Sequence, residues 1–190
     1  MDTINFTRMQ DSTKEEYELL STYHHERHRA MADKVLAELK IAKGVKTGHK
    51  VDRYIHSLQT ATRAYRDGAD EETVVCAVLH DIGDALAPLN HPEIAAAILK
   101  PYIGADNHWL VLHHSIFQGY FFWHHIGQDR MAREKFRGHA MFERTASFCE
   151  RWDQTSFDPQ YDTMPFEAFE PMIRRLFARP PFAQTEAAAE

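Results

Sequence analysis

The sequence predicts an all-helical protein, and three observations support that prediction. Apolar residues recur three and four positions apart through most of the 190 residues, no segment keeps the alternation of a strand, and residues that begin or end helices stand between the periodic stretches. A chain of this length can bury a core without disulfides, so we expect a single domain over residues 1–190, with an ordered core at about 12–180.

The first expected helix is long and covers residues 13–42. Ser12 and Glu15 have the spacing of a capping box at its start, and Gly44 follows its end. The stretch between them is rich in Glu, Leu, Ala and Lys, which all favour helix.

The next two helices are expected at residues 51–65 and 71–82. Apolar residues recur at helical spacing in the first, and Gly68 closes it. The second is apolar on nearly all sides, which would also suit a strand, but its helical neighbours favour a buried helix.

The second half of the chain continues the helical pattern. Pro92 and Glu93 begin a helix that ends near Leu99, before Pro101. The tail after Pro180 has little to bury, and we expect it to be frayed. Further helices are expected at residues 106–117, 129–136, 139–152 and 166–178.

The composition disfavours several classes of function. The formal net charge is -6 and no Lys/Arg block stands out, which argues against nucleic-acid binding and favours a small-molecule substrate. Cys76 and Cys149 lie within expected helices, so we expect free thiols in a reducing cytoplasm. No apolar run approaches the ~18 residues that span a bilayer, so neither export nor membrane insertion is expected.

Histidines are the unusual feature of the chain. There are 13, most of them between His49 and His125, and this clustering suggests a metal site. His80 and Asp81 are adjacent at the end of an apolar helix, where both can turn toward one cation while the carboxylate bridges to a second. Alone, such a pair would be an ordinary helix end. Other candidate ligands lie on separate elements, and they are His56, His91, one of His113 and His114, and Asp153.

The segments around these residues are YIHSLQTA, LHDIGD, NHPEIAAAIL, VLHHSIFQG and ERWDQ, and in this order they resemble the HD-domain superfamily of phosphohydrolases and diiron oxygenases. The resemblance implies an HD-domain helical bundle. It implies that His56, His80, Asp81 and Asp153 hold one metal, and that Asp81, His91 and His114 hold the other, with Asp81 as the shared catalytic ligand. His113 is the alternative to His114.

One observation opposes this ligand set. On its helix, His56 shares a side with Asp52, Gln59 and Arg63, opposite the apolar stripe. Periodicity alone would place that side in solvent, although a polar internal cavity would give the same pattern.

The resemblance leaves two reaction classes. ERWDQ resembles the corresponding segment of the hydroxyphosphonate dioxygenases of organophosphonate catabolism, and a six-ligand set suits a dinuclear centre. That branch implies two Fe ions, mixed-valent Fe(II)/Fe(III), with O2 as a substrate. The alternative is a phosphohydrolase acting on a nucleotide or small phosphate ester, and a silent metal-binding module ranks third. Imidazole and carboxylate ligands also suit Mn, Zn, Ni or Co.

The substrate is suggested by departures from the family pattern. Asp84 stands where relatives carry Lys or His, and Gln118 where a phosphonate-binding Lys is expected. An acid with aromatic faces suits a quaternary ammonium group, although each ring alone is more simply a core residue. We therefore expect (R)-1-hydroxy-2-(trimethylammonio)ethylphosphonate, cleaved to glycine betaine and phosphate. The rings are Phe117, Tyr120, Phe121, Phe122 and Trp123.

An arginine-rich stretch supplies candidate anion contacts. Arg130, Arg133 and Arg137 recur at spacings of three and four, which places them on one face of the expected helix, and His139 follows. Guanidinium groups match tetrahedral oxyanions, so we expect these residues to bind the phosphonate. The alternative is a solvated basic surface with weak ion pairs. The sequence leaves the oligomeric state open.

Overall fold

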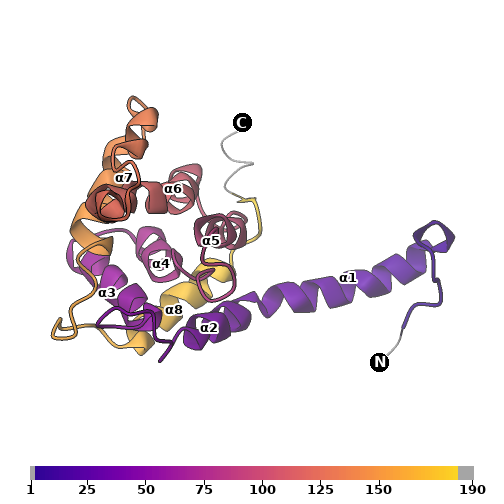
Figure 1. Ribbon diagram of the computed structural model, residues 1–190. Coiled ribbons are helices and arrows are strands. Elements are labelled where there is room, and N and C mark those ends of the chain that lie inside the picture. The colour runs from indigo at the N-terminus through magenta and orange to yellow at the C-terminus, as the bar shows by residue number, and fades with distance from the viewer. Residues whose placement is uncertain (1–2, 184–190) are drawn as a thin grey trace.

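The computed structural model describes residues 3–183, and in this part of the chain it contains eight α-helices and no strand (Figure 1). The all-helical prediction is confirmed. The helices are α1 (Lys14–Arg29), α2 (Met31–Ile41), α3 (Arg53–Arg66), α4 (Glu71–Leu79), α5 (His91–Leu99), α6 (Ala105–Phe122), α7 (Phe142–Phe148) and α8 (Phe166–Phe177).

Helix α4 forms the centre of the bundle, packed against α3, α6 and α8. Its residues from Val74 to Leu79 are almost fully buried. This explains why the segment is apolar on nearly all sides, and the predicted buried helix is confirmed. Asp70 caps the helix by accepting a hydrogen bond from Thr73 N at 2.9 Å.

The polar side of α3 is covered by an irregular segment, residues 154–165. Gln59 Nε2 donates to Asp158 O at 2.6 Å, Arg63 donates to Thr155 O at 3.0 Å, and Thr62 Oγ1 accepts from Met164 N at 3.0 Å. Side-chain groups of α3 thus satisfy backbone groups of a segment with little regular structure of its own.

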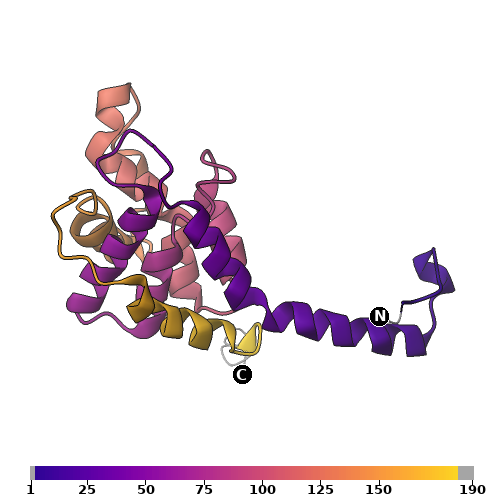
Figure 2. The same cartoon turned by 90° about the horizontal axis from the view of Figure 1, so that it is seen from below.

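The predicted first helix is broken at Ala30 (φ -80°, ψ 1°) into α1 and α2. Helix α2 lays Val35, Leu36 and Leu39 into the core, whereas α1 buries no residue and points away from the bundle (Figures 1 and 2). Only the second half of the predicted helix has an apolar face that the bundle can bury.

The predicted capping box is one residue too early. Thr13 is the N-cap, with its Oγ1 accepting from Glu16 N at 3.3 Å, and Glu16 accepts from Thr13 N at 3.1 Å. Both Ser12 with Glu15 and Thr13 with Glu16 have the required spacing, so the motif alone could not decide between them.

Several later boundaries also differ. Helix α6 continues to Phe122 rather than residue 117. The α-helix predicted at 129–136 is a 3-10 helix, Ala132–Phe136, and the helix predicted at 139–152 begins at Phe142 and ends in a π-helical turn, Cys149–Asp153. Most of the tail that we expected to be frayed lies outside the described residues. Among the described helices, none is both long and apolar enough to cross a membrane.

Candidate metal centre

The fold brings six predicted ligands together from five elements. His56 comes from α3, and His80 and Asp81 come from the end of α4. The remaining three are His91 from α5, His114 from α6 and Asp153 from the π-helical turn. All six are buried except His91, whose side chain is 16% exposed.

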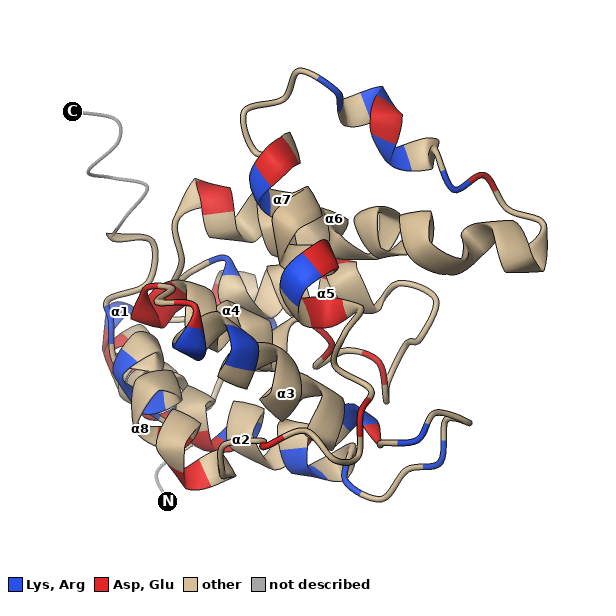
Figure 3. Ribbon diagram, turned by 90° about the vertical axis from the view of Figure 1, so that its left-hand side faces the viewer, with Lys and Arg blue, Asp and Glu red and all other residues tan. Residues whose placement is uncertain are grey.

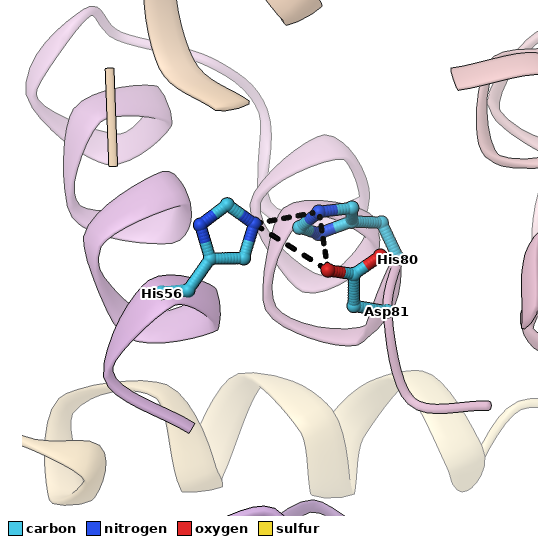
Figure 4. A group of neighbouring side chains, drawn as sticks. All are labelled: His56, His80 and Asp81. Carbon is cyan, nitrogen blue, oxygen red and sulfur yellow. Dashed lines mark hydrogen bonds and ion pairs between the residues drawn. The ribbon is translucent and has the colours of Figure 1, made fainter. Parts of the chain in front are cut away.

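One oxygen of the Asp81 carboxylate faces the first group of ligands (Figure 4). Asp81 Oδ2 lies 3.5 Å from His56 Nε2 and 3.6 Å from His80 Nε2, and these two nitrogens are 3.3 Å apart. Asp153 Oδ1 closes the group at 3.2 Å from His56 Nε2 and 3.7 Å from His80 Nε2.

The other oxygen of Asp81 faces a second group. Asp81 Oδ1 lies 3.2 Å from His91 Nε2 and 3.3 Å from His114 Nε2, and these nitrogens are 3.3 Å apart. The two groups also adjoin, since possible ligand atoms of His80, His114 and Asp153 lie within 4.8 Å of one another. Asp81 is therefore the one carboxylate that divides its two oxygens between two histidine pairs.

Backbone carbonyls fix the orientation of all four imidazoles. A carbonyl oxygen only accepts, so each Nδ1 carries a proton and each Nε2 is the nitrogen that faces the cluster as a possible metal ligand. The acceptors are Ser156 O for His56 at 2.9 Å, Ala77 O for His80 at 2.9 Å, Pro88 O for His91 at 2.9 Å and Val111 O for His114 at 2.7 Å.

This donor set fits metal ions. Four nitrogen lone pairs and two carboxylates converge in a buried space, where they would repel one another without a cation. Ligands bound at about 2.0–2.2 Å to one ion lie roughly 3.0–3.5 Å apart, and the separations within the groups are 3.2–3.7 Å. Asp153 Oδ2 is also buried without a hydrogen-bond partner.

The pKa values of the clustered residues also indicate that the cluster favours positive charge. Burial opposes a charge on His80, but the carboxylates of Asp81 and Asp153 outweigh it and raise the pKa of His80 to about 9. Burial also opposes ionisation of Asp81, yet the surrounding imidazoles hold its pKa well below the ordinary value, and they lower the pKa of Asp153 too. Burial lowers the pKa of His114. The cluster therefore attracts positive charge, which a divalent cation supplies more fully than a proton.

Comparison with known families bears on this centre. The family model described as HD domain matches residues 53–152. The chain belongs to the HD-domain family. Members are mostly enzymes, metal-dependent hydrolases or oxygenases, and HD domains bind divalent metals. The match covers five of the six candidate ligands and ends one residue before Asp153. The search of curated proteins found no match.

Within this HD domain the ambiguity between His113 and His114 disappears. His114 is buried and faces Asp81, whereas the His113 ring stacks on Trp109 with centroids 4.1 Å apart and its Nδ1 donates to Trp109 O at 2.8 Å. The two side chains point to different sides of α6, and only His114 reaches the cluster.

The objection to His56 is also resolved. Its side chain is 1% exposed because residues 154–165 cover this side of α3, and the Phe157 ring stacks on its imidazole at 4.4 Å. The polar stripe of α3 faces a polar interior rather than solvent. Periodicity could not distinguish the two, since the covering segment lies 100 residues away in sequence.

Arg53 is a site residue that the sequence analysis missed. Its guanidinium lies 3.3 Å from Asp81 Oδ2 and 3.4 Å from Asp84 Oδ2. A signal was present, because Arg53 precedes His56 by three positions and so shares its side of α3. Asp84, the predicted cation contact, is thus paired with a cation of the chain itself.

Two polar residues of α6 touch the ligands. The Gln118 amide donates to Asp153 Oδ1 at 3.2 Å, and its Oε1 is buried without a partner. Ser115 Oγ lies 3.0 Å from His91 Nε2. Gln118 was a predicted substrate contact, but nothing in the sequence distinguished Ser115 from other serines.

The arginine stretch divides into two parts. The guanidinium carbons of Arg130 and Arg133 lie 4.3 and 3.7 Å from the Tyr120 ring centroid, and both Nε atoms are buried without a hydrogen-bond partner. Arg133 Nε also lies 3.7 Å from Glu134 Oε1. Arg137 is exposed and paired with both Glu134 and Glu143. The shared helix face predicted for the three arginines is wrong, because the 3-10 helix ends at Phe136.

The remaining predicted substrate contacts lie among aromatic side chains. His139 stacks on Trp109 at 4.3 Å, so its ring packs there rather than against the ligands. Phe117 is fully buried and packs on Phe142 at 5.0 Å, as expected for a core residue. Beyond its first turn α6 carries no Asp, Glu, Lys or Arg, whereas the 3-10 helix Ala132–Phe136 is strongly charged (Figure 3).

Proposed function

We propose that this HD-domain protein is a dinuclear oxygenase that cleaves the carbon–phosphorus bond of a 1-hydroxyalkylphosphonate. The main support is the geometry of the Asp81 carboxylate: each of its two oxygens faces a separate histidine pair at 3.2–3.6 Å. A one-metal site would need only one of these pairs. The proposed substrate is (R)-1-hydroxy-2-(trimethylammonio)ethylphosphonate.

The overall reaction is balanced by dioxygen alone. The hydroxylated carbon becomes a carboxylate, phosphorus leaves as phosphate, and O2 accepts the four electrons and contributes both new oxygen atoms. Glycine betaine and phosphate are the products. Two iron ions, one Fe(II) and one Fe(III), would supply substrate chelation and dioxygen activation when bound.

The protein's own residues position the ligands and the substrate. His56, His80, Asp81 and Asp153 would hold one ion, and Asp81, His91 and His114 the other. Arg53 and Gln118 donate toward the carboxylates of Asp81 and Asp153, which restrains their rotation. Two metal ions that share one carboxylate need such restraint, because a freely rotating Asp81 carboxylate would not bridge them.

The partly exposed side chains indicate where substrate enters. His91 is 16%, Asp84 18% and Arg53 23% exposed, whereas the other ligands are nearly inaccessible. Substrate therefore approaches across this edge. Arg53 offers a guanidinium to a phosphonate there, and Asp84 offers a carboxylate to a quaternary ammonium group.

Arg130 and Arg133 remain the second candidate anion site. The charge of Arg133 acts on Cys149, whose pKa is raised by burial and by Asp153 and lowered by Arg133. Cys149 in turn donates to His114 O at 3.4 Å. The Arg133 Nε is buried without a hydrogen-bond partner, and it lies 3.7 Å from Glu134 Oε1.

A phosphohydrolase is the second candidate, and Arg53 is the observation that favours it. A guanidinium 3.3 Å from the proposed bridging carboxylate would bind a phosphate ester as readily as a phosphonate. A metal-activated water would then replace dioxygen.

Anaerobic purification with iron, partial reduction and electron spin resonance would test the proposal. We expect a coupled mixed-valent signal, and phosphate release from the hydroxyphosphonate that matches dioxygen uptake mole for mole. Equal phosphate release with and without dioxygen, at matched iron loading, would reverse the order of the two candidates.

A further inference from the structure

A cavity of about 420 Å³ lies between α5, α6 and the 3-10 helix Ala132–Phe136. Helices α5 and α6, which form two of its sides, are neighbours in the bundle (Figure 1). Its lining includes the side chains of Glu93, Ser115 and Lys135 and two aromatic rings, Trp123 and Phe136. The cavity is therefore large enough for a small organic group and offers it both charged and aromatic contacts.

The cavity adjoins the second group of candidate ligands. Ser115 lines it, and the Oγ of this residue lies 3.0 Å from His91 Nε2. Leu89 and Glu93, which stand two positions before and after His91 in the chain, also line it. A group held in this cavity is therefore a close neighbour of the His91 imidazole.

Trp123 forms part of the cavity wall because α6 has a glycine beneath it. A Cβ on Gly119 would overlap the Trp123 indole, so only glycine lets this ring lie directly against the backbone of α6. Gly119 is buried within the helix, where glycine is less favourable than alanine. The result is an indole held in one position beside the cavity.

Other rings that could contact an ammonium group already have partners. Phe117 is fully buried in the core. Arg130 and Arg133 lie over the Tyr120 ring, with their guanidinium carbons 4.3 and 3.7 Å from its centroid. Trp123 lines the cavity instead, and indole is the aromatic side chain that binds cations most strongly.

Glu93 adds a carboxylate to the same cavity. Its side chain is exposed and forms no ion pair with the described residues, whereas Asp84, the acid at the edge where substrate enters, lies 3.4 Å from Arg53. The cation in the lining, Lys135, is exposed, and its Nζ lies 4.9 Å from the Phe136 ring centroid. Glu93 is therefore free to accept a cation from a ligand.

We propose that this cavity binds the quaternary ammonium group of the substrate, with the Trp123 indole against its methyl groups and the Glu93 carboxylate as its counter-ion; this assignment rests on the function proposed above. In that substrate a single methylene separates the nitrogen from the hydroxylated carbon. The ammonium group must therefore lie close to the metal-binding residues, as the cavity does. Asp84 meets the substrate at entry, and Trp123 with Glu93 holds its cationic end.

Calorimetric titration of the metal-loaded full chain under argon tests the assignment. Choline is the proposed substrate without its phosphonate group, and 3,3-dimethylbutan-1-ol is the uncharged molecule with carbon in place of the choline nitrogen. We expect choline to bind about tenfold more tightly than the alcohol. Equal affinities, or no binding of choline, would overturn the proposal.

Substitutions locate the binding within this cavity. Trp123→Leu should remove most of the preference for choline, and Trp123→Phe should retain part of it. Glu93→Gln should raise the choline Kd at least about twofold, whereas Lys135→Gln should lower it, because a neighbouring positive charge opposes a bound cation.

Asp106→Asn is the matched control for Glu93→Gln. It removes an exposed acid from the first turn of α6, as Glu93→Gln does from the first turn of α5, and it should leave the choline Kd unchanged. Equal effects of these two variants, weaker choline binding in Lys135→Gln, or wild-type preference in Trp123→Leu would each contradict the assignment.

The cavity assignment and the proposed reaction can fail separately. Choline titration requires neither dioxygen nor turnover, so selective binding that depends on Trp123 and Glu93 would stand even if the protein proved to be a phosphohydrolase. Conversely, dioxygen-dependent phosphate release by Trp123→Leu with the wild-type KM for the hydroxyphosphonate would support the oxygenase and overturn the cavity assignment.

Discussion

At the scale of single residues, Asp81 lies at the centre of the candidate metal cluster. Its carboxylate is 5% exposed and lies 3.3 Å from the Arg53 guanidinium. It also lies within 3.6 Å of four imidazole nitrogens. Each of the other five ligands belongs to one group at these short distances. Substituting Asp81 should therefore change metal content differently from substituting a ligand that belongs to only one group.

Replacing Asp81 by Ala should remove both metals, because only this side chain touches each group of ligands. His91→Ala should cost one metal and leave the group of His56, His80 and Asp153 loaded. Elemental analysis of protein loaded under anaerobic conditions gives the stoichiometry directly. A wild-type plateau at one ion per chain, or full occupancy in the Asp81 variant, would contradict the bridging role.

Metal uptake should depend on pH through His80. Its pKa is raised to about 9 without metal, so below that pH the ring carries a proton that metal must displace. Affinity should fall about tenfold for each pH unit below 9. Competition titrations with a chelator between pH 7 and 9 measure the slope. An affinity independent of pH would mean that His80 is neutral in the metal-free protein.

The arginines offer a kinetic test with an internal control. Arg133→Ala should raise KM for the phosphonate at least about tenfold, roughly 1.4 kcal/mol of binding, while metal content is unchanged. Arg137→Ala should leave KM unchanged, because Arg137 is 55% exposed and engaged by Glu134 and Glu143. Wild-type kinetics in both variants would leave Arg53 as the anion site.

At the scale of helices, local patterns predicted the core but not its coverings. Helix α4 could be predicted because a segment apolar on all sides has only one place in a bundle. The burial of His56 could not, since it depends on residues 154–165, which have no periodic pattern and contact α3 across about half the chain. The six candidate ligands were predicted through the ordered family pattern, and the fold brings them together. Ser115 had no signal of any kind.

The turn after α4 sets the position of α5. A Cβ on Gly83 would lie 2.8 Å from Ile94 Cβ and 2.9 Å from His91 O, so glycine allows the start of α5 to approach the end of α4. This approach places His91 opposite Asp81.

Gly83→Ala should therefore cost about 1–3 kcal/mol of unfolding free energy and weaken the second metal selectively. Urea unfolding and metal analysis measure the two effects. Ala85→Ser, at an exposed position in the same turn, is the control. Equal metal content in both variants would show that α5 accommodates the methyl group without moving His91.

At the scale of the whole molecule, the candidate metal centre lies in the middle of the bundle rather than on its surface. Helices α3, α4, α5 and α6 each contribute candidate ligands, and the cluster lies against core residues such as Phe148, whose ring is 5.7 Å from His80. Bound metal should therefore stabilise the entire fold.

Removing metal with a chelator should lower Tm by roughly 5–10 °C, since a ligand at 100 times its Kd contributes about 2.7 kcal/mol. Differential scanning calorimetry of metal-loaded and metal-free protein measures the change. The Asp81→Ala variant should be insensitive to the chelator. A chelator effect of the same size in that variant would place the stabilising ion elsewhere.

The carbonyl partners of the four imidazoles also imply an order of folding. His80, His91 and His114 each donate to a carbonyl three residues earlier. The orientation of these rings is therefore fixed as soon as their own helical turns form. His56 donates to Ser156 O, 100 residues away, and can be aimed only after the C-terminal segment has docked on α3. The second group of ligands can therefore mature early in synthesis, whereas the first is completed only when nearly the whole chain has emerged from the ribosome, and full metal loading marks the end of folding.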